Sequence, residues 1–415
     1  MTILAVGVVV PACTGEGGGT HPASTTSPPA SSTTTALPST TTALPSTTTT
    51  RSSSTTSTTP CVSTSDIDTW PVRRRAAQLL VLPVLDFDVE PLAPLLREGT
   101  GGVLFLGSAA APPDLRSRLA EATAGTDPTA APLVLADVEG GGVQRLKGAV
   151  DPFPWPRELA ATMSVDQVGE LATTVAEQMV AAGVGVDLAP VLDLDDRAGP
   201  SAANPVGRRS FSLDPATAGS YGIAFARGLQ AGGVLPVAKH FPGLGGATGN
   251  TDNGPAATRP YAELRGAGLR PFVDAIAAGV PAIMVSNAST PGLTTEPASV
   301  SAAVIGELLR TELGFRGLVV TDSLSAGAIT EAGYSLPEAA AAAIEAGADL
   351  ILFGSTLTAA GRALLSPANV AASRQAIIDA LDDAVASGRL TPARLDDAVS
   401  HVLAAKGISV CGSGA

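Results

Sequence analysis

One stretch of the chain, Lys239 to Asp252, gathers most of the side chains that could perform chemistry. Lys239 and His240 end an apolar run, and a Gly/Pro-rich loop then leads to a single carboxylate at Asp252. The chain has three histidines, of which His21 lies in a low-complexity segment and His401 in a helical pattern. His240 is therefore the histidine left for a site. Any further proton-transfer group must then be a carboxylate.

A second carboxylate with chemical potential is Asp322, which closes the apolar run Gly317–Thr321. At the end of a buried strand, such a group could attack an electrophilic carbon or balance a developing positive charge. The alternative interpretation is an N-cap of the helix that follows. Lys239 and His240 also have an alternative, which is a buried lysine–carboxylate pair beside a core histidine.

A glycine-rich motif runs from Asp137 to Leu146. Its glycines would let the backbone approach a ligand closely, and Asp137 and Arg145 could bind hydroxyl groups. The alternative is a surface turn with a salt bridge. The motif lacks the Lys-Ser/Thr ending of a phosphate-binding loop.

Two further groups of charged residues have open interpretations. Arg208 and Arg209 lie in a loop rich in Pro and Asp, where one of them could point into a site or both could be solvated. Asp187 and Asp193 flank a short apolar segment, and each could be a structural acid at a strand end or a ligand.

The elements that would position these residues are short apolar runs that alternate with helical stretches, as in parallel strands buried on both faces. The runs are 77–84, 101–107, 132–137, 184–190, 235–240, 282–286, 317–322 and 348–353. The helical stretches are Val165–Ala182, Tyr221–Ala231, Leu264–Ala278, Ala302–Leu313, Leu336–Ala346 and Ala371–Ser387. This pattern predicts an α/β fold, a (β/α)8 TIM-type barrel, whose sites lie at the carboxyl ends of the strands. The alternative is an open doubly wound sheet, although no GxGxxG motif follows a strand.

Composition bounds the rest of the chain. The net charge is −13, no run is rich in Lys or Arg, and aromatic residues make up 3%, which argues against nucleic-acid binding. Residues 14–60 are rich in Ser, Thr and Pro and are expected to be a disordered linker. Residues 61–415 are expected to form a single domain, which we expect to be monomeric.

The chain begins with an apolar run that suits a signal segment, and residues 10–13 resemble a bacterial lipobox ending at Cys13. We therefore expect an exported bacterial protein, either anchored to the membrane only through a lipid on Cys13 or secreted free; a third possibility is neither. Cys61 and Cys411 bracket the domain. In an exported protein they are expected to form a disulfide, with two free thiols as the alternative.

Four motifs in order carry a family resemblance: Asp137–Leu146, Arg209–Phe211, Lys239–Gly243 and Thr321–Leu324. Together they resemble glycoside hydrolase family 3, and within it the single-domain bacterial β-N-acetylglucosaminidase (β-hexosaminidase) branch. The similarity covers about residues 68–406.

The resemblance implies a barrel domain that removes terminal β-linked N-acetylglucosamine from cell-wall-derived saccharides or muropeptides. It implies that Asp322 is the nucleophile of a retaining reaction that needs no metal or organic cofactor. The residues implied to hold the sugar are Asp137, Arg145, Arg209, Lys239 and His240.

The chain departs from the family pattern at three places. Gly142 replaces the usual Arg of the glycine-rich motif, Leu244 replaces a loop His, and Asn250-Thr251-Asp252 replaces Asp-Ser-His. The His of that motif is the family's acid/base, so Asp252 is our candidate for this role, oriented by Asn250. A carboxylate can act as the acid if burial or the charge of Asp322 raises its pKa.

Two other functions remain open at this point. A non-catalytic sugar- or muropeptide-binding lipoprotein would keep the sugar-holding residues without efficient proton transfer, although such a protein has no need of Asp322. A β-glucosidase-like specificity is the other alternative, because these motifs do not reveal an N-acetyl pocket.

Overall fold

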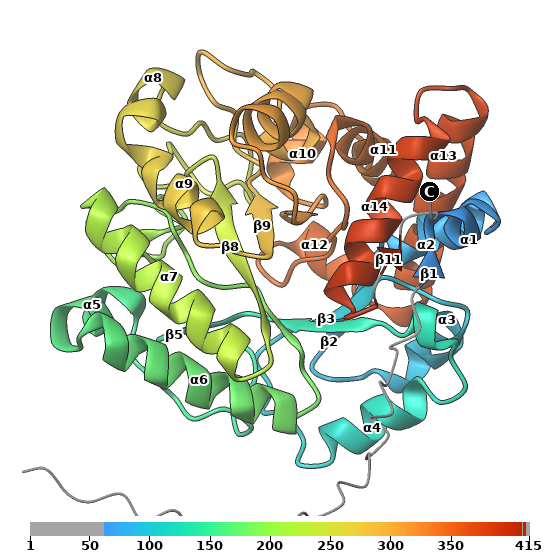
Figure 1. Ribbon diagram of the computed structural model, residues 1–415, viewed down its shortest axis with the longest axis horizontal. Coiled ribbons are helices and arrows are strands. Elements are labelled where there is room, and N and C mark those ends of the chain that lie inside the picture. Colours follow the sequence, from blue (N-terminus) through green and yellow to red (C-terminus); the bar gives the residue numbers. More distant parts are fainter. Residues whose placement is uncertain (1–61, 409, 412–415) are drawn as a thin grey trace, which may run out of the picture. The chain divides into compact units, whose positions relative to one another are not determined.

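The computed structural model describes residues 62–408 and 410–411, and all of them belong to one compact unit. Its main feature is a curled, seven-stranded parallel sheet in the order β10-β9-β8-β7-β4-β3-β2, with helices around it (Figure 1). The strands are β2 (Val81–Leu85), β3 (Gly102–Leu106), β4 (Leu133–Ala136), β7 (Val186–Asp187), β8 (Leu235–Phe241), β9 (Ala282–Val285) and β10 (Leu318–Thr321). The predicted α/β class is confirmed.

The eighth apolar run, residues 348–353, contributes isolated bridges and no named strand. Leu350 bridges Val320 of β10, and Ile351 bridges Leu80, just before β2. These two positions therefore link the outer strands of the seven-stranded sheet. The complete eight-stranded barrel stays a prediction.

Helices follow most of the strands, and each of the six predicted helical stretches contains one. They are α1 (Thr64–Asp68), α2 (Val72–Gln78), α3 (Ala93–Arg97), α4 (Leu115–Ala122), α5 (Pro156–Thr162), α6 (Val165–Ala181), α7 (Pro215–Ala231), α8 (Tyr261–Glu263), η4 (Leu264–Gly268), α9 (Arg270–Ala277), η6 (Ala303–Glu312), α10 (Gly327–Glu331), α11 (Leu336–Ala346), α12 (Ala359–Ala363), α13 (Pro367–Ala386) and α14 (Pro392–Ala405). The 302–313 stretch and the start of the 264–278 stretch have π-type hydrogen bonding. A short hairpin, β5 (Val138–Gly140) and β6 (Val143–Gln144), follows β4.

The long helices α6 and α7 show how local signals and close packing cooperate. α6 begins with a capping box between Ser164 and Gln167, which satisfies amide groups that a helix start leaves unpaired. α7 begins at Pro215 after the N-cap Asp214. The two helices lie so close that a Cβ atom at Gly228 would be 2.2 Å from the carbonyl oxygen of Gly169. The sequence therefore requires glycine where the helices cross.

The first predicted strand, residues 77–84, was placed too early. Helix α2 continues to Gln78, and β2 starts only at Val81. Ala76, Ala77 and the residues of β2 are all buried, and a buried helix end has the same continuous apolar pattern as a buried strand.

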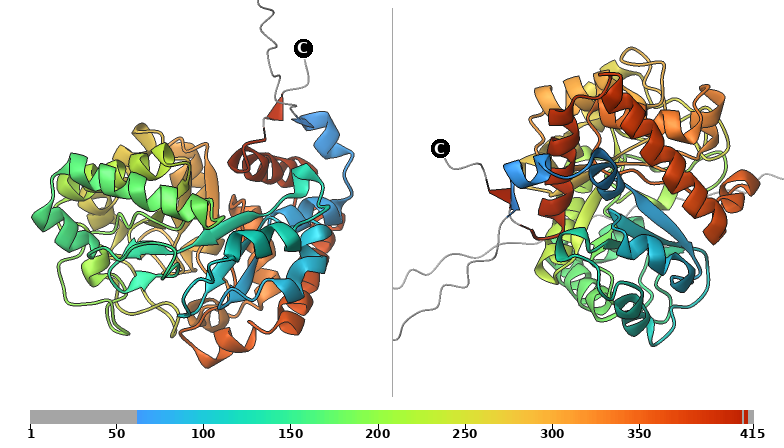
Figure 2. Two further views of the ribbon diagram at one scale, coloured as in Figure 1. Left: turned by 90° about the horizontal axis from the view of Figure 1, so that it is seen from below. Right: turned by 90° about the vertical axis from the view of Figure 1, so that its right-hand side faces the viewer.

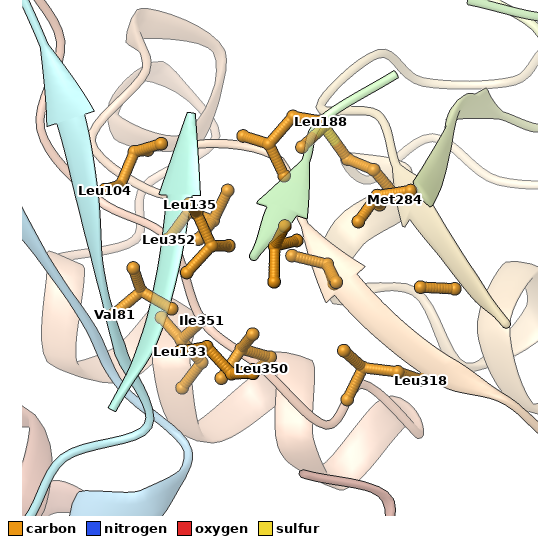
Figure 3. Packing of buried hydrophobic residues seen from close by; sticks show 14 of the residues in the cluster. Val81, Leu104, Leu133, Leu135, Leu188, Met284, Leu318, Leu350, Ile351 and Leu352 are labelled. Atoms are coloured by element: carbon orange, nitrogen blue, oxygen red, sulfur yellow. The ribbon is translucent and has the colours of Figure 1, made fainter. Parts of the chain in front are cut away.

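Apolar side chains from different strands converge inside the curled sheet (Figure 3). They include Val81, Leu104, Leu133, Leu135, Leu188, Met284, Leu318 and Leu350. This packed interior leaves the carboxyl ends of the strands as the place for a site.

The two ends of the described chain lie together. β1 (Val62–Ser63) pairs in parallel with β11 (Val410–Cys411), and the red β11 lies beside the blue start of the chain (Figure 2). Cys13, the linker 14–60 and Cys61 lie outside the described residues, and so does the side chain of Cys411. The lipidation and the disulfide therefore stay predictions. Within the described residues, no helix has the length and apolar character needed to cross a membrane.

Candidate active site

A pocket of about 640 Å³ lies where the strands of the sheet end. Residues of all the motifs singled out in the sequence line it, although they are far apart in the chain. They are Asp137, Arg145, Arg209, Lys239, His240, Asn250, Asp252 and Asp322. The structure thus brings together every candidate catalytic and sugar-holding residue, while their roles stay predictions.

Lys239 occupies the centre of a buried cluster of charges at the end of β8. Its Nζ atom is 2.7 Å from Asp137 Oδ1 and 2.6 Å from Glu139 Oε1, and the lysine is 2% exposed. The alternative of a buried lysine–carboxylate pair is thus correct as a description of contacts. Because Lys239 and both carboxylates line the pocket, the pairing also positions groups that face it.

Glu139 is a site residue that the sequence analysis did not single out. Its two carboxylate oxygens each accept a hydrogen bond at 2.7 Å from Arg209, a bidentate pair, and one of them also lies against Lys239. Burial alone would raise the pKa of Glu139, but the charges of Arg209 and Lys239 outweigh it and the pKa is lowered. One signal was present: Asp137 and Glu139 are two residues apart, so they share a face of an extended chain.

His240 is held by Asp193, which is fully buried. The ring atom Nδ1 lies 2.7 Å from Asp193 Oδ2, and Nε2 lies 3.3 Å from Nη2 of Arg209. A carboxylate only accepts and a guanidinium only donates, so both contacts are satisfied by a neutral ring with its proton on Nδ1. With that proton held by Asp193, His240 is suited to accept hydrogen bonds and not to donate a proton to substrate.

The two acids with open interpretations, Asp187 and Asp193, have positioning roles, since neither lines the pocket. Asp187 Oδ1 accepts a hydrogen bond at 2.9 Å from the amide of Val138, between the pocket residues Asp137 and Glu139. Burial holds the pKa of Asp187 well above its ordinary value. Asp187 therefore supports the start of the hairpin.

The hairpin itself corrects part of the interpretation of the glycine-rich motif. Gly140 and Gly141 have positive φ values of 95° and 55°, and a Cβ at Gly141 would lie 2.1 Å from the Trp155 ring. These glycines are thus needed for a turn packed against Trp155 as much as for ligand access. The predicted salt bridge of the turn is also different, because the cation paired with Asp137 is Lys239, while Arg145 donates to the carbonyl oxygen of Gly107 at 3.1 Å.

Asp322 directly follows β10 and does not cap the next helix. Its amide donates to the Val285 carbonyl oxygen at 2.9 Å, continuing the sheet, and its Oδ1 accepts from the amide of Ser323 at 2.7 Å. Helix α10 starts only at Gly327, with Ala326 as its N-cap residue. The N-cap alternative is therefore wrong, and Asp322 is a strand-end carboxylate that lines the pocket.

Asp252 is a carboxyl group whose pKa is raised to about 6. Burial is the main cause, and the negative charge of Asp322 is the second. Asn250 contacts Asp252 differently from our expectation, because its Oδ1 accepts a hydrogen bond at 2.9 Å from the backbone amide of Asp252 and not from the carboxyl. Asn250 thus holds the loop, while the carboxyl itself accepts a hydrogen bond from Ser355 at 3.2 Å.

The loop that carries Asp252 docks on the start of α10. The carbonyl oxygens of Thr251 and Asp252 each accept a hydrogen bond at 3.0 Å, from the amides of Ala328 and Gly327. A Cβ at Gly327 would lie 2.7 Å from the backbone nitrogen of Gly254. The close approach keeps the loop over the pocket, five residues along the chain from Asp322.

A group with metal-ligating residue types lies elsewhere in the described chain and consists of Asp349, Asp397 and His401. None of the three lines the pocket. Both oxygens of Asp349 already contact arginines, Arg310 and Arg394. Two neighbouring cations make this a structural ion network and a poor site for a metal ion.

Comparison with known proteins gives a consistent result. Residues 72–405 match the family model described as the glycosyl hydrolase family 3 N terminal domain. The chain is 36% identical over 343 residues to the beta-hexosaminidase LpqI of Mycobacterium tuberculosis, covering 81% of this chain and 82% of that protein.

Solved structures are similar as well. A family 3 glycosyl hydrolase from Mycobacterium smegmatis is 36% identical with a TM-score of 0.72, covering 82% of this chain and 99% of that one. A beta-N-acetylhexosaminidase from Beutenbergia cavernae is 30% identical with a TM-score of 0.70, at 82% and 99% coverage.

Proposed function

From its membership of glycosyl hydrolase family 3, which makes the chain a glycosidase, we propose that it removes terminal β-linked N-acetylglucosamine with retention of configuration. The observation that carries the mechanism is the pair of carboxylates in one pocket, Asp322 and Asp252, of which Asp252 has its pKa raised to about 6. Two carboxyl groups with different protonation are what retaining hydrolysis requires.

In the first step, the Asp322 carboxylate forms a bond to the anomeric carbon while the bond to the leaving oxygen breaks. The protonated Asp252 gives its proton to that oxygen as the aglycone leaves. In the second step, the Asp252 carboxylate takes a proton from water as the water oxygen attacks the anomeric carbon, and the bond to Asp322 breaks. Both carboxyls thereby return to their starting states.

The sugar would be held by the charged cluster around Lys239. Asp137 and Arg145 can bind hydroxyl groups, while Arg209 and His240 lie between the cluster and Asp252. Since the internal ion pairs are already formed, the groups are preorganised and little ordering is needed when the sugar binds.

Incubation with an aryl N-acetyl-β-glucosaminide tests the proposal against its rivals. Release of the aryl group with a burst supports the glycosyl-enzyme mechanism. Protection from thermal unfolding by N-acetylglucosamine without any release would instead identify a sugar- or muropeptide-binding protein. Faster cleavage of the plain glucoside would identify a β-glucosidase-like enzyme.

Replacement of Asp252 by alanine should lower kcat/KM for a disaccharide by about 10²- to 10⁴-fold, which is the usual contribution of a general acid. An aryl substrate with an acidic leaving group needs no protonation and should lose far less. Because the acid must be protonated, wild-type kcat/KM should fall as the pH rises above about 6, and the variant should lose this alkaline limb. An unchanged disaccharide rate in Asp252→Ala would show that another group is the acid/base.

The pocket mouth bears on the aglycone. The exposed residues that line it are all uncharged, namely Gly142, Pro200, Ser201, Ala202, Asn253 and Leu357, whereas the charged lining residues lie deeper. We therefore expect an uncharged aglycone to be preferred. N-acetylmuramic acid carries a lactyl carboxylate beside the leaving oxygen, near Asp252, and these described residues offer no cation to it.

The expected result is a kcat/KM for the disaccharide with an N-acetylglucosamine aglycone at least about 5-fold above that with an N-acetylmuramic acid aglycone, the effect of ~1 kcal/mol between like charges near 4 Å in water. Steady-state kinetics with both disaccharides measures it. The preference should shrink as salt is raised, because salt screens exposed charges. A preference for the muramic aglycone at low salt would contradict the charge argument.

We further propose that the domain is a closed (β/α)8 barrel, since residues 350–351 bond to both outer strands, and that it acts as an exported monomer on cell-wall saccharides. A lipid on Cys13 would hold it at the membrane. Fractionation of cells that express wild type and Cys13→Ser tests the anchor, because only the wild type should sediment with membranes.

A further inference from the structure

Ser355 is a buried residue of the pocket that the mechanism has not yet used. It is 7% exposed and follows the apolar run 348–353. Its hydroxyl donates a hydrogen bond to Asp252 Oδ1 at 3.2 Å and accepts one from the amide of Leu357 at 3.1 Å. These contacts join the loop after the last strand to the carboxyl proposed as acid/base, across 103 residues of sequence.

The two contacts fix the direction of the hydroxyl proton. An amide can only donate, so the Leu357 contact occupies a lone pair of Ser355 Oγ and leaves its proton for another acceptor. That acceptor is Asp252 Oδ1. An oxygen that accepts this hydrogen bond favours the form in which the carboxyl proton lies on the other oxygen.

We propose that Ser355 is a positioning residue that holds Asp252 by Oδ1 and thereby makes Oδ2 the oxygen that exchanges the proton with the glycosidic oxygen and with water. The inference rests on the proposed function. Oδ2 donates the proton as the bond to the aglycone breaks, and it takes one from water in the second step. Ser355 keeps its own proton throughout.

The charges around Asp252 show why such a contact matters. Burial and the charge of Asp322 raise the pKa of Asp252, while the Ser355 hydroxyl, Arg209 and His240 lower it. Asp252 must be protonated in the first step and ionised in the second. The hydrogen bond from Ser355 favours the ionised form, and so it counteracts part of the effect of burial.

The loop that carries Ser355 is built to hold it in place. Gly354 has a φ of +86°, and a Cβ at Gly361 would lie 2.7 Å from Cβ of Ser355. Thr358 caps α12 by accepting a hydrogen bond from the amide of Gly361 at 3.0 Å. Because α12 packs directly on Ser355, the serine cannot move away from Asp252 without moving the helix.

The test compares wild type, Ser355→Ala and Ser355→Thr on two substrates. In Ser355→Ala, kcat/KM for the N-acetylglucosamine disaccharide should fall by about 3- to 10-fold, the usual value of one hydrogen bond. For a dinitrophenyl glycoside, kcat/KM should change little. The alkaline limb for the disaccharide should move to higher pH, because the lost hydrogen bond no longer favours ionised Asp252. Ser355→Thr keeps the hydroxyl and should restore the wild-type pH profile.

Thr358→Ala is the matched control, since it removes the cap of the same loop without touching Asp252, and its pH profile should match wild type. If Ser355→Ala lowers both substrates equally and leaves the pH profile unchanged, Ser355 is only structural and the inference is overturned. If wild type cleaves neither substrate, the proposed function fails instead, so the two failures are distinct.

Discussion

Replacement of Asp322 by asparagine is expected to abolish turnover, with kcat reduced by roughly 10⁴-fold or more, as for other enzymes that lose a nucleophile. Asparagine has nearly the same shape but cannot form the ester bond to the anomeric carbon. Steady-state release from an aryl N-acetyl-β-glucosaminide measures the loss. Because the sugar-holding cluster is untouched, N-acetylglucosamine should still raise the melting temperature of the variant.

Asp114→Asn provides a matched control, since Asp114 is an exposed carboxylate before α4 whose side chain makes no capping hydrogen bond. It should keep wild-type kcat and stability. A rate for Asp322→Asn above about a tenth of wild type would mean that no glycosyl-Asp322 intermediate forms. Loss of sugar binding together with loss of turnover would place Asp322 in the binding set as well.

Replacement of Glu139 by alanine is expected to have the largest effect on folding. The change leaves Lys239 buried beside Arg209 without their shared carboxylate, and removal of one partner of a buried ion pair costs about 3–5 kcal/mol. Chemical denaturation measures the free energy of unfolding. Activity should also be lost, because Arg209 and Lys239 would no longer be held toward the sugar.

The pH dependence of this contribution has a definite sign. The pKa of Glu139 in the folded protein lies below its ordinary value of 4.5, so the stabilisation is complete above that value. It decreases as the pH falls below 4.5, because the unfolded chain takes up the proton first. The difference in unfolding free energy between wild type and Glu139→Ala should therefore narrow in acid.

An adjacent exposed pair supplies the comparison. Arg208 contacts Glu158 at 2.8 Å, with side chains about half exposed. Glu158→Ala should cost ~0–1 kcal/mol, as surface pairs do. Equal losses for Glu139→Ala and Glu158→Ala would show that burial does not set the cost at Glu139.

Much of the site could be predicted because parallel strands end at the same edge of a sheet. Asp137, Lys239 and Asp322 each close an apolar run, and the topology then brings them together without any knowledge of the loops. Asp252 could be named because the chain has no other histidine or acid at that loop position, and its contact with the other charges depended only on the loop lying over the pocket.

The remaining site residues could not be predicted because their contacts depend on three-dimensional packing. Asp193 holds a ring 47 residues away, and Ser355 donates across 103 residues. A serine in a loop has no pattern that distinguishes it from other serines. Glu139 was the nearest to discovery, since its spacing from Asp137 places both on one face, but only burial shows that it serves two cations.

The contacts around Lys239 form an unbroken series from Asp137 through Lys239, Glu139 and Arg209 to His240, which Asp193 holds in turn. Residues linked in this way have energetic effects that do not add, as a double-mutant cycle would measure. Attempts to engineer a new sugar preference at any one of these positions would disturb its neighbours. Altered specificity should therefore be sought through paired, charge-conserving exchanges within the series, or at the uncharged mouth, where single changes are independent of it.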